Sequence, residues 1–281
     1  QDKIAVLIDA ENVSKKYIKL IMDEVSDYGI ATYKRIYGDF TNPSVMAWQD
    51  ALRDFALTPV FQFNYTKGKN ASDSALIIDA MDILYSGKVN GFCLVTSDSD
   101  FTKLVLRLRE SGMTVIGMGE RKTPNAFVSA CETFKFLDIL LNDENPSQNP
   151  SLPQTRKESE ADGSRKEAEK ESDPNAVSNI PNMEEMEKEI ISIINTHADD
   201  DGWVDLSELG DNLPKRVPGF DPRNYKCTKL KQFIELFDCV EVRSARNPHN
   251  KILSIIYVRV KQKEEKPVLS KVRRGGKQKK N

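Results

Sequence analysis

Cysteine and histidine are scarce in this sequence of 281 residues, which contains four cysteines and two histidines. The cysteines are widely spaced and none forms a CxxC pair, so neither a zinc site nor a disulfide scaffold is expected. No apolar run approaches the roughly 18 residues needed to span a bilayer. Residues 4–8 (IAVLI) lack the basic flank and cleavage site of a signal peptide. We therefore expect a cytoplasmic protein with no membrane partner.

The sequence also lacks an overall excess of positive charge, with 41 basic and 43 acidic residues and a formal net charge of −2. The charge is unevenly distributed, because residues 261–281 carry nine basic residues and only two acidic ones. Attraction to phosphate depends on local rather than total charge. A nucleic-acid partner is therefore not excluded, but overall basicity gives no argument for one.

Composition divides the chain into four parts. Residues 142–182 contain no aromatic residue and are rich in Pro, Ser, Glu, Lys and Asn, which is typical of a disordered, acidic linker. Residues 261–281 are too charged and too rich in Gly to fold, and we expect a disordered basic tail. The remaining segments, 1–141 and 183–260, are long enough to form two separate domains.

The first segment alternates between strand-like and helix-like patterns. Strands are predicted at 4–8, 31–38, 58–65, 91–97 and 113–119, and helices at 14–27, 43–56, 72–86, 101–111 and 124–134. This alternation predicts βαβ crossovers and a mostly parallel sheet covered by helices. Ligands of such sheets bind at the carboxyl ends of the strands.

The second segment has a different pattern. Helices are predicted at 183–198, 205–214 and 222–237, followed by strands at 239–244 and 252–260. Three helices followed by a hairpin predict a winged helix-turn-helix, which is a binding architecture.

Four aspartates of the first segment stand where a parallel sheet would bring them together. Asp9 ends the first predicted strand, Asp98 and Asp100 follow the fourth, and Asp73 opens a helix. Like charges at a few ångströms destabilise each other unless a cation offsets the repulsion. Mg²⁺ takes oxygen ligands and leaves positions open for phosphate, so this cluster predicts metal-assisted phosphodiester hydrolysis.

Helix capping is the alternative role for single members of this cluster, because an Asp after a strand often accepts the first amides of the next helix. Asp9, Asp73 and Asp100 are all candidates for such caps. Asn12 is a candidate either to orient a metal-bound water or to cap the helix. Asp79 lies six residues after Asp73, on a different face of the helix, and is predicted to be in the outer shell of the site.

These acidic motifs carry a family resemblance. IAVLIDAENVS, KNASDSALIIDAMD and LVTSDSDFTKLVLRLRESGMTVIGMG resemble an NYN domain of the PIN-like nuclease superfamily over about residues 3–140. The resemblance implies a Rossmann-like, three-layer α/β sandwich with a parallel sheet, whose acidic cluster binds Mg²⁺ or Mn²⁺ and cleaves RNA. It implies that Asp9, Asp73, Asp98 and Asp100 are the metal ligands and catalytic residues.

Other enzyme classes fit the acids less well. A haloacid-dehalogenase-type phosphatase needs its DxD pair on the first strand, whereas this chain has the pair after the fourth. A Toprim-like site needs Glu at the end of its first strand, where this chain has Asp9. The KGK at 67–69 lacks the spacing of a phosphate-binding P-loop.

The second segment resembles an OST-HTH, or LOTUS, domain in the stretches 201–213, 217–238 and 240–244. The resemblance implies a winged-helix RNA-binding module. Lys226 and Lys229 are predicted to share a face of the third helix, where they could contact phosphates. The full set of predicted RNA-binding residues is Arg223, Lys226, Lys229, Lys231, Arg243, Arg246 and Lys251. Five aromatic residues, Trp203, Phe220, Tyr225, Phe233 and Phe237, are predicted to fill the core.

The sequence thus predicts a divalent-metal-dependent endoribonuclease tethered to an RNA-binding module by a linker that leaves their relative geometry free. The alternative is an RNA-binding regulatory protein whose nuclease fold is catalytically inactive. The oligomeric state is left open by the sequence.

Overall fold

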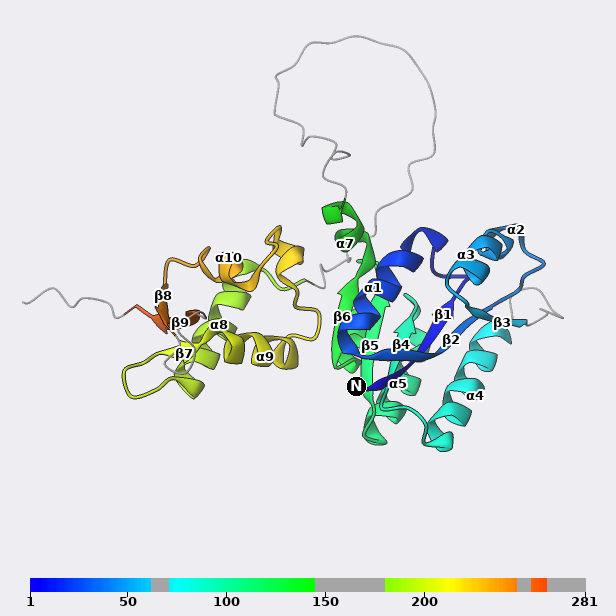
Figure 1. Ribbon diagram of the computed structural model, residues 1–281, viewed down its shortest axis with the longest axis horizontal. Helices are drawn as coiled ribbons and strands as arrows, with labels where there is room; N and C mark the ends of the chain where they lie inside the picture. The colour runs from blue at the N-terminus through cyan, green and yellow to red at the C-terminus, as the bar shows by residue number, and fades with distance from the viewer. Residues whose placement is uncertain (62–70, 145–179, 247–253, 262–281) are drawn as a thin grey trace, which may run out of the picture.

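The computed structural model describes residues 1–61, 71–144, 180–246 and 254–261, which form two domains (Figure 1). Most of the predicted linker and nearly all of the predicted basic tail lie outside the described residues. No helix within the described part of the chain is long and apolar enough to cross a membrane.

The first domain is built on a six-stranded sheet. Its strands are β1 (Lys3–Asp9), β2 (Ile30–Gly38), β3 (Thr58–Phe61), β4 (Gly91–Val95), β5 (Thr114–Gly119) and β6 (Thr133–Phe136). The order is β3-β2-β1-β4-β5-β6 and every neighbouring pair is parallel. The predicted parallel α/β fold is confirmed.

Helices cover both faces of this sheet (Figure 1). They are η1 (Lys15–Tyr17), α1 (Ile18–Tyr28), α2 (Pro43–Met46), α3 (Gln49–Asp54), α4 (Ala71–Ser86), η2 (Ser99–Phe101), α5 (Thr102–Glu110), α6 (Asn125–Ala130) and α7 (Leu137–Glu144). One hydrophobic core lies between the sheet and α1, α2, α3 and α7. The other lies between the sheet and α4, α5 and α6, which completes three layers.

Strand β1 shows why the sheet forms. Ile4, Val6 and Ile8 pack into one core, and Ala5 and Leu7 into the other. A central parallel strand is buried on both faces and therefore reads as a continuous apolar run. The IAVLI segment is thus an internal strand.

The structure differs from the sequence prediction at several elements of the first domain. The segment predicted as one helix over 43–56 forms two, α2 and α3. The helix predicted over 124–134 ends at Ala130, and β6 follows as a sixth strand that was not predicted. Its four residues, TFKF, alternate in burial, but such a short run gives a weak strand signal. Helix α7 runs to Glu144, beyond the predicted domain boundary at 141.

The second domain contains α8 (Met183–His197), α9 (Leu206–Arg216), η4 (Pro222–Tyr225) and α10 (Leu230–Ile234). Its sheet has the order β7-β9-β8, formed by β7 (Val204–Asp205), β9 (Ser254–Val260) and β8 (Val240–Arg246), all antiparallel. Asn182 and Glu185 form a capping box that fixes the start of α8. This arrangement is a winged helix, as predicted.

The third helix of the winged helix is shorter than predicted. Lys226 adopts a left-handed conformation with φ of 61°, which ends η4, and α10 begins only at Leu230. The prediction that Lys226 and Lys229 share a helical face is therefore wrong. Four of the five predicted core aromatics are in the core, since Phe220, Phe233 and Phe237 are buried there and Tyr225 packs against them. Trp203 is also buried, but its ring lies under Arg243 and Arg259.

Candidate functional site

The sheet order places three of the four predicted aspartates at one edge. From β1 the chain proceeds to β2 and β3 on one side, then returns to form β4 on the other side of β1. Such a switch point leaves a crevice at the carboxyl ends of the two central strands. Asp9 is the last residue of β1, and Asp98 and Asp100 follow β4. This group of side chains, with Asp73, is called the acidic edge below.

Asp9 is the most buried residue of the acidic edge, with 2% of its surface exposed. Its Oδ1 accepts hydrogen bonds from the backbone amides of Glu11 (3.0 Å) and Asn12 (3.2 Å). The side-chain amide of Asn12 donates to Oδ2 at 2.7 Å. Asp9 therefore forms an Asx turn and is not a helix cap, because the next helix, η1, begins only at Lys15.

Thr96 links Asp9 to Asp98. Its buried hydroxyl donates to Oδ2 of Asp9 at 2.9 Å and accepts the backbone amide of Asp98 at 3.1 Å. Burial raises the pKa of Asp9, although the bonds from Asn12 and Thr96 act to lower it. The Asp98 side chain caps η2 by accepting the amide of Asp100 at 2.9 Å. The capping role predicted for Asp100 thus belongs to Asp98.

Asp73 lies in the first turn of α4, which starts at Ala71. Its carboxylate interacts electrostatically with the other acids of the acidic edge. Its pKa is raised to about 6, first by burial and then by the charges of Asp9, Asp98, Glu11 and Asp100 in that order. Each of these groups is therefore near enough to repel a charge on Asp73. The other acids predicted from the sequence therefore act on Asp73, and Glu11 acts with them.

Glu11 was not predicted as a site residue. Its Oε2 accepts the hydroxyl of Ser72 at 3.2 Å and its Oε1 accepts the amide of Asp39 at 3.1 Å. Glu11 thereby connects the segment after β1 with the start of α4. Its position between Asp9 and Asn12 in the DAEN motif was the signal in the sequence. Thr96 was also missed, and its signal was its position two residues before Asp98.

Asp79 has partners on β2. Its carboxylate forms an ion pair with Arg35 and accepts the hydroxyl of Tyr37. These bonds hold the middle of α4 against the sheet. Asp73 lies on the same helix, less than two turns closer to its start. The geometry gives Asp79 a structural bond to β2, while its predicted place in the outer shell of a metal site stays a prediction.

The chemistry of the acidic edge suits a hard divalent cation, because its donors are carboxylate oxygens whose mutual repulsion helps to raise the pKa of Asp73. Among the described residues, however, no group of three or more His, Cys, Asp or Glu side chains is placed to hold one metal ion. The donor set fits Mg²⁺ or Mn²⁺, and coordination by three of these carboxylates would require side-chain rearrangement.

Two basic residues, Lys16 and Lys122, lie near Glu120, just after the end of β5. Glu120 accepts the hydroxyl of Tyr17 at 3.0 Å and lies 2.9 Å from the ammonium group of Lys122. The hydrogen bond from Lys122 is the main cause of the lowered pKa of Glu120, and Lys16 contributes. Lys16 and Lys122 are exposed, so their ammonium groups are available to solvent beside the carboxyl ends of β1 and β5.

The predicted RNA-binding residues of the second domain fall into different environments. Lys226, Lys229 and Lys231 are exposed around the start of α10, and Lys231 lies 3.6 Å from Glu235. Arg223 lies instead against the first domain, where it contacts Glu24 at 2.6 Å. The structure therefore brings the three lysines into one stretch of surface and separates Arg223 from them.

The wing places Arg243 over aromatic rings. Its guanidinium lies 4.3 Å from the centre of the Trp203 ring and 5.8 Å from that of Tyr257. Arg259 also lies over Trp203, at 4.5 Å, and pairs with Glu241 at 2.8 Å. Arg246 ends β8, and Lys251 lies outside the described residues. Cation–π contact holds Arg243 at the surface of the wing.

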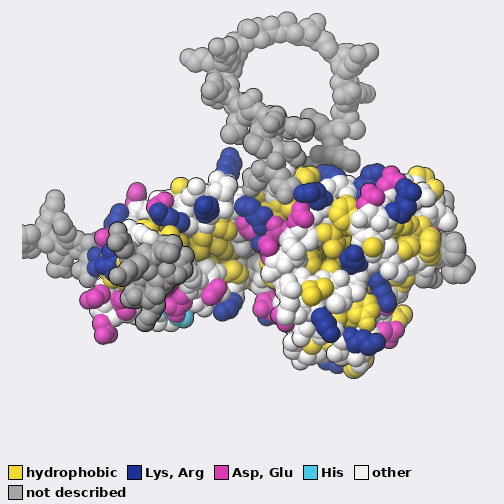
Figure 2. All heavy atoms as spheres, in the orientation of Figure 1, with side chains coloured by type: hydrophobic (Ala, Val, Ile, Leu, Met, Phe, Trp, Pro, Cys, Tyr) yellow, Lys and Arg dark blue, Asp and Glu magenta, His cyan; other side chains and the backbone are white. Residues whose placement is uncertain are grey.

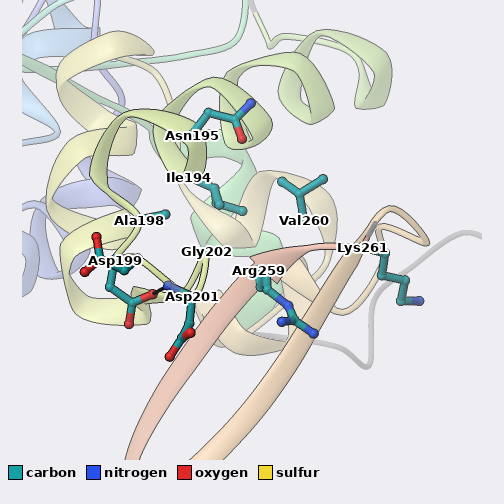
Figure 3. Close-up of a pocket in the computed structure, with 10 residues that line it drawn as sticks. Ile194, Asn195, Ala198, Asp199, Asp201, Gly202, Arg259, Val260 and Lys261 are labelled. Atoms are coloured by element: carbon teal, nitrogen blue, oxygen red, sulfur yellow. Dashed lines mark hydrogen bonds between the residues drawn. The ribbon is translucent and has the colours of Figure 1, made fainter. Parts of the chain in front are cut away.

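A cavity of about 690 Å³ lies in the second domain, and none of the acidic-edge residues lines it (Figure 3). Asp199 and Asp201 line one side, and Arg259 and Lys261 the other. The carboxylates make this cavity a poor match for phosphate.

The viewed surface of both domains has basic and acidic side chains interspersed (Figure 2). On that face no broad basic patch is seen among the described residues.

The first domain is a parallel α/β sheet with carboxylates at its switch point, and the second is a winged helix. The sequence model of the NYN domain matches residues 3–140, and that of the OST-HTH/LOTUS domain matches residues 182–252. The chain is therefore an NYN domain followed by an OST-HTH/LOTUS domain. These two domains support an RNA-related role, either as a nuclease or in RNA binding.

Two solved structures are similar to parts of the chain. One is a protein of unknown function from Vibrio parahaemolyticus, with 20% identity, a TM-score of 0.41, and coverage of 48% of this chain and 91% of that one. The other is a protein fragment from Chromobacterium violaceum, with 28% identity, a TM-score of 0.24, and coverage of 31% and 91% respectively. Among curated proteins, no match was found.

Proposed function

We propose that this protein is a Mg²⁺- or Mn²⁺-dependent endoribonuclease whose winged-helix domain binds RNA. The observation that supports this most strongly is the position of the carboxylates at the switch point of the sheet, where burial and then four neighbouring carboxylates raise the pKa of Asp73. Carboxylates that lie close together repel one another, and a bound cation offsets this repulsion.

Asp9, Asp73, Asp98 and Asp100 are the proposed ligands. When bound there, a divalent cation supplies the charge stabilisation and water activation that phosphodiester hydrolysis needs. Asp9 is held by Asn12 and Thr96, and Thr96 also fixes the backbone at Asp98. These bonds orient two of the proposed ligands before any substrate binds. Asp79 holds α4, and with it Asp73, against β2.

RNA is proposed to contact Lys226, Lys229, Lys231, Arg243, Arg246 and Lys251 in the second domain. The exposed Lys16 and Lys122 add positive charge beside the acidic edge, where a scissile phosphate would approach. The basic tail adds sequence-independent attraction. We propose that the protein acts in the cytoplasm, and its four cysteines are all free thiols, as suits a reducing compartment.

The alternative is an RNA-binding regulatory protein with a catalytically inactive nuclease fold. Its supporting observation is that Asp9 already accepts four hydrogen bonds and that no three acids of the described residues are placed around one ion. In that case the acidic edge is a set of turns and caps.

Cleavage of a labelled RNA decides between the two. The full-length protein, Asp9→Asn and the control Asp23→Asn are incubated with Mg²⁺, with Mn²⁺ or with EDTA. Asp23 is an exposed residue of α1 paired with Lys19, outside the acidic edge. We expect metal-dependent cleavage by the wild type and the control and none by Asp9→Asn. RNA binding without cleavage in either metal would favour the regulatory protein.

A further inference from the structure

The two domains meet along the outermost strand on one side of the six-stranded sheet, which is a different place from the acidic edge. Strand β6 is the edge strand, and the amide of Phe134 donates to the carbonyl oxygen of Pro218 in the second domain at 2.6 Å. An edge strand has unpaired amides that readily bond another chain segment. Here the segment between α9 and η4 occupies this position.

Close packing accompanies this backbone bond. A Cβ added to Gly219 would lie 3.2 Å from the Phe136 ring and 3.5 Å from Cγ1 of Val128. Ile180, just before α8, packs against the core of the first domain. The contact at Gly219 leaves little room for a side chain, which indicates a fitted surface.

Four charged side chains form a network between the domains. Glu24 on α1 and Lys135 on β6 belong to the first domain, and Asp221 and Arg223 to the second. Arg223 contacts Glu24 at 2.6 Å, and Lys135 contacts Asp221 at 2.7 Å and Glu24 at 3.5 Å. Glu24 and Asp221 are each 6% exposed. Both carboxylates are thus buried and paired with cations from both domains.

The network is electrostatically balanced, with two cations and two anions. Burial alone would raise the pKa of Asp221, but Arg223 and Lys135 lower it to about 2. Burial alone would lower the pKa of Lys135, but Asp221 and Glu24 raise it. Buried charges without partners are strongly unfavourable. Separating the domains would leave each carboxylate without one of its cations.

Arg223 has little capacity left for another ligand. A guanidinium has five N–H donors. Arg223 uses four of them: Nη1 and Nη2 donate to Glu24, at 2.6 and 3.0 Å, and Nε and Nη2 donate to Asp221, at 3.0 and 2.8 Å. With one N–H donor left, Arg223 cannot form a bidentate contact with a phosphate.

We propose that the NYN and OST-HTH/LOTUS domains dock as one body through Phe134–Pro218, Gly219 and this charged network, and that Arg223 serves docking instead of RNA binding. This replaces the expectation that the linker leaves the domains free. The consequence for RNA rests on the proposed function: RNA held by the winged helix reaches the acidic edge in a set orientation. Strand β6 is two strands from β4, a lateral distance of about 10 Å.

Hydrogen exchange of the full-length protein tests the docking. We expect the Phe134 amide to be protected in the wild type and in Asp23→Asn. It should exchange at least about tenfold faster in Glu24→Gln and in Gly219→Val, while amides of β1 and α8 keep their protection. If Gly219→Val loses protection at amides throughout both domains, the milder variant Gly219→Ala is measured in its place. An unprotected Phe134 amide in the wild type, or unchanged protection in both interface variants, would overturn the proposal.

RNA affinity as a function of salt tests the role of Arg223. If Arg223 serves docking, Arg223→Gln and Glu24→Gln should change RNA affinity by the same factor, and each should keep the wild-type salt slope. A phosphate contact by Arg223 would instead lower the slope by about 1 in Arg223→Gln alone and would overturn this role. Absence of RNA binding in the wild type would refute the proposed function, while the exchange measurement still decides whether the domains dock.

Discussion

The hydroxyl of Thr96 donates a 2.9 Å hydrogen bond to Oδ2 of Asp9, which ties the end of β4 to the end of β1. The same hydroxyl accepts the amide of Asp98 at 3.1 Å. One buried side chain therefore positions two aspartates that lie 89 residues apart in the sequence. The acidic edge depends on this bond as well as on the order of the strands.

Replacing Thr96 with Val keeps the shape of the side chain and removes both hydrogen bonds. We expect the free energy of unfolding at pH 7 to fall by about 1–3 kcal/mol, because a buried carboxylate is deprived of a donor. Cleavage should fall with it. Denaturant unfolding measures the effect, and Thr102→Val is the control, because Thr102 is half-buried and its hydroxyl donates to the Ser99 carbonyl. Equal destabilisation of both variants would contradict a special role for Thr96.

Asp98→Asn should abolish metal-dependent RNA cleavage and leave the fold intact. The amide oxygen can still accept the backbone amide of Asp100, so the cap on η2 is retained. Removal of one negative charge lowers the repulsion at the acidic edge, and the metal-free variant should be more stable by on the order of 1 kcal/mol. Circular dichroism, denaturant unfolding and a cleavage assay measure these effects. Full cleavage by a folded Asp98→Asn protein would refute its assignment as a ligand.

Asp73 should give the metal-free protein a characteristic dependence of stability on pH. Its pKa is raised from 3.8 to about 6, so the folded state holds this proton more tightly than the unfolded state. Stability therefore falls as the pH rises from about 4 through about 6. Since Asp73 is partly exposed, we expect a decrease of only about 1–2 kcal/mol.

The variant Asp73→Asn isolates this contribution. In EDTA it should be more stable than the wild type at pH 8, and the difference should shrink towards pH 4. Urea unfolding at several pH values measures the difference, with Asp23→Asn as the control. A difference that is constant with pH would show that the charge of Asp73 is not its cause.

Deleting residues 262–281 should weaken RNA binding equally for all sequences. The truncation leaves Lys261, whose amide bonds the Cys239 carbonyl at 2.8 Å, so the end of β9 stays fastened. The salt slope should fall by about 0.7 to 0.9 for every phosphate that the tail neutralises in the wild type. Binding to several RNA sequences at a series of salt concentrations tests this. A change in sequence preference would mean that the tail reads bases.

The sequence predicted the sheet and its acidic edge because both are encoded locally. Apolar runs such as residues 4–8 identify buried strands, and Asp9 and Asp98 stand at or just after the ends of two of them. The parallel topology then brings these residues together. The fold and the two domain families are confirmed, while the roles of the individual site residues stay predictions.

Other features depend on contacts that no local pattern reveals. Strand β6 is four residues long and exists through its pairing with β5. The break at Lys226 depends on one residue in a left-handed conformation, which residues other than Gly rarely adopt. The sequence predicted Arg223 as a phosphate contact. It gave no sign of the ion pair with Glu24, because the two residues lie 199 positions apart. Long-range ion pairs of this kind leave no periodic signal in the sequence.

The central claim is that the acidic edge is a cation site, and a thermal-shift titration with Mg²⁺ and Mn²⁺ tests it most directly. A ligand that binds only the folded state should stabilise it by roughly 1–3 kcal/mol at ten- to hundredfold excess over Kd. We expect the melting temperature of the wild type to rise with metal concentration and that of Asp9→Asn and Asp100→Asn to stay constant. A wild-type melting temperature that does not respond to either metal would contradict the claim and favour the catalytically inactive fold.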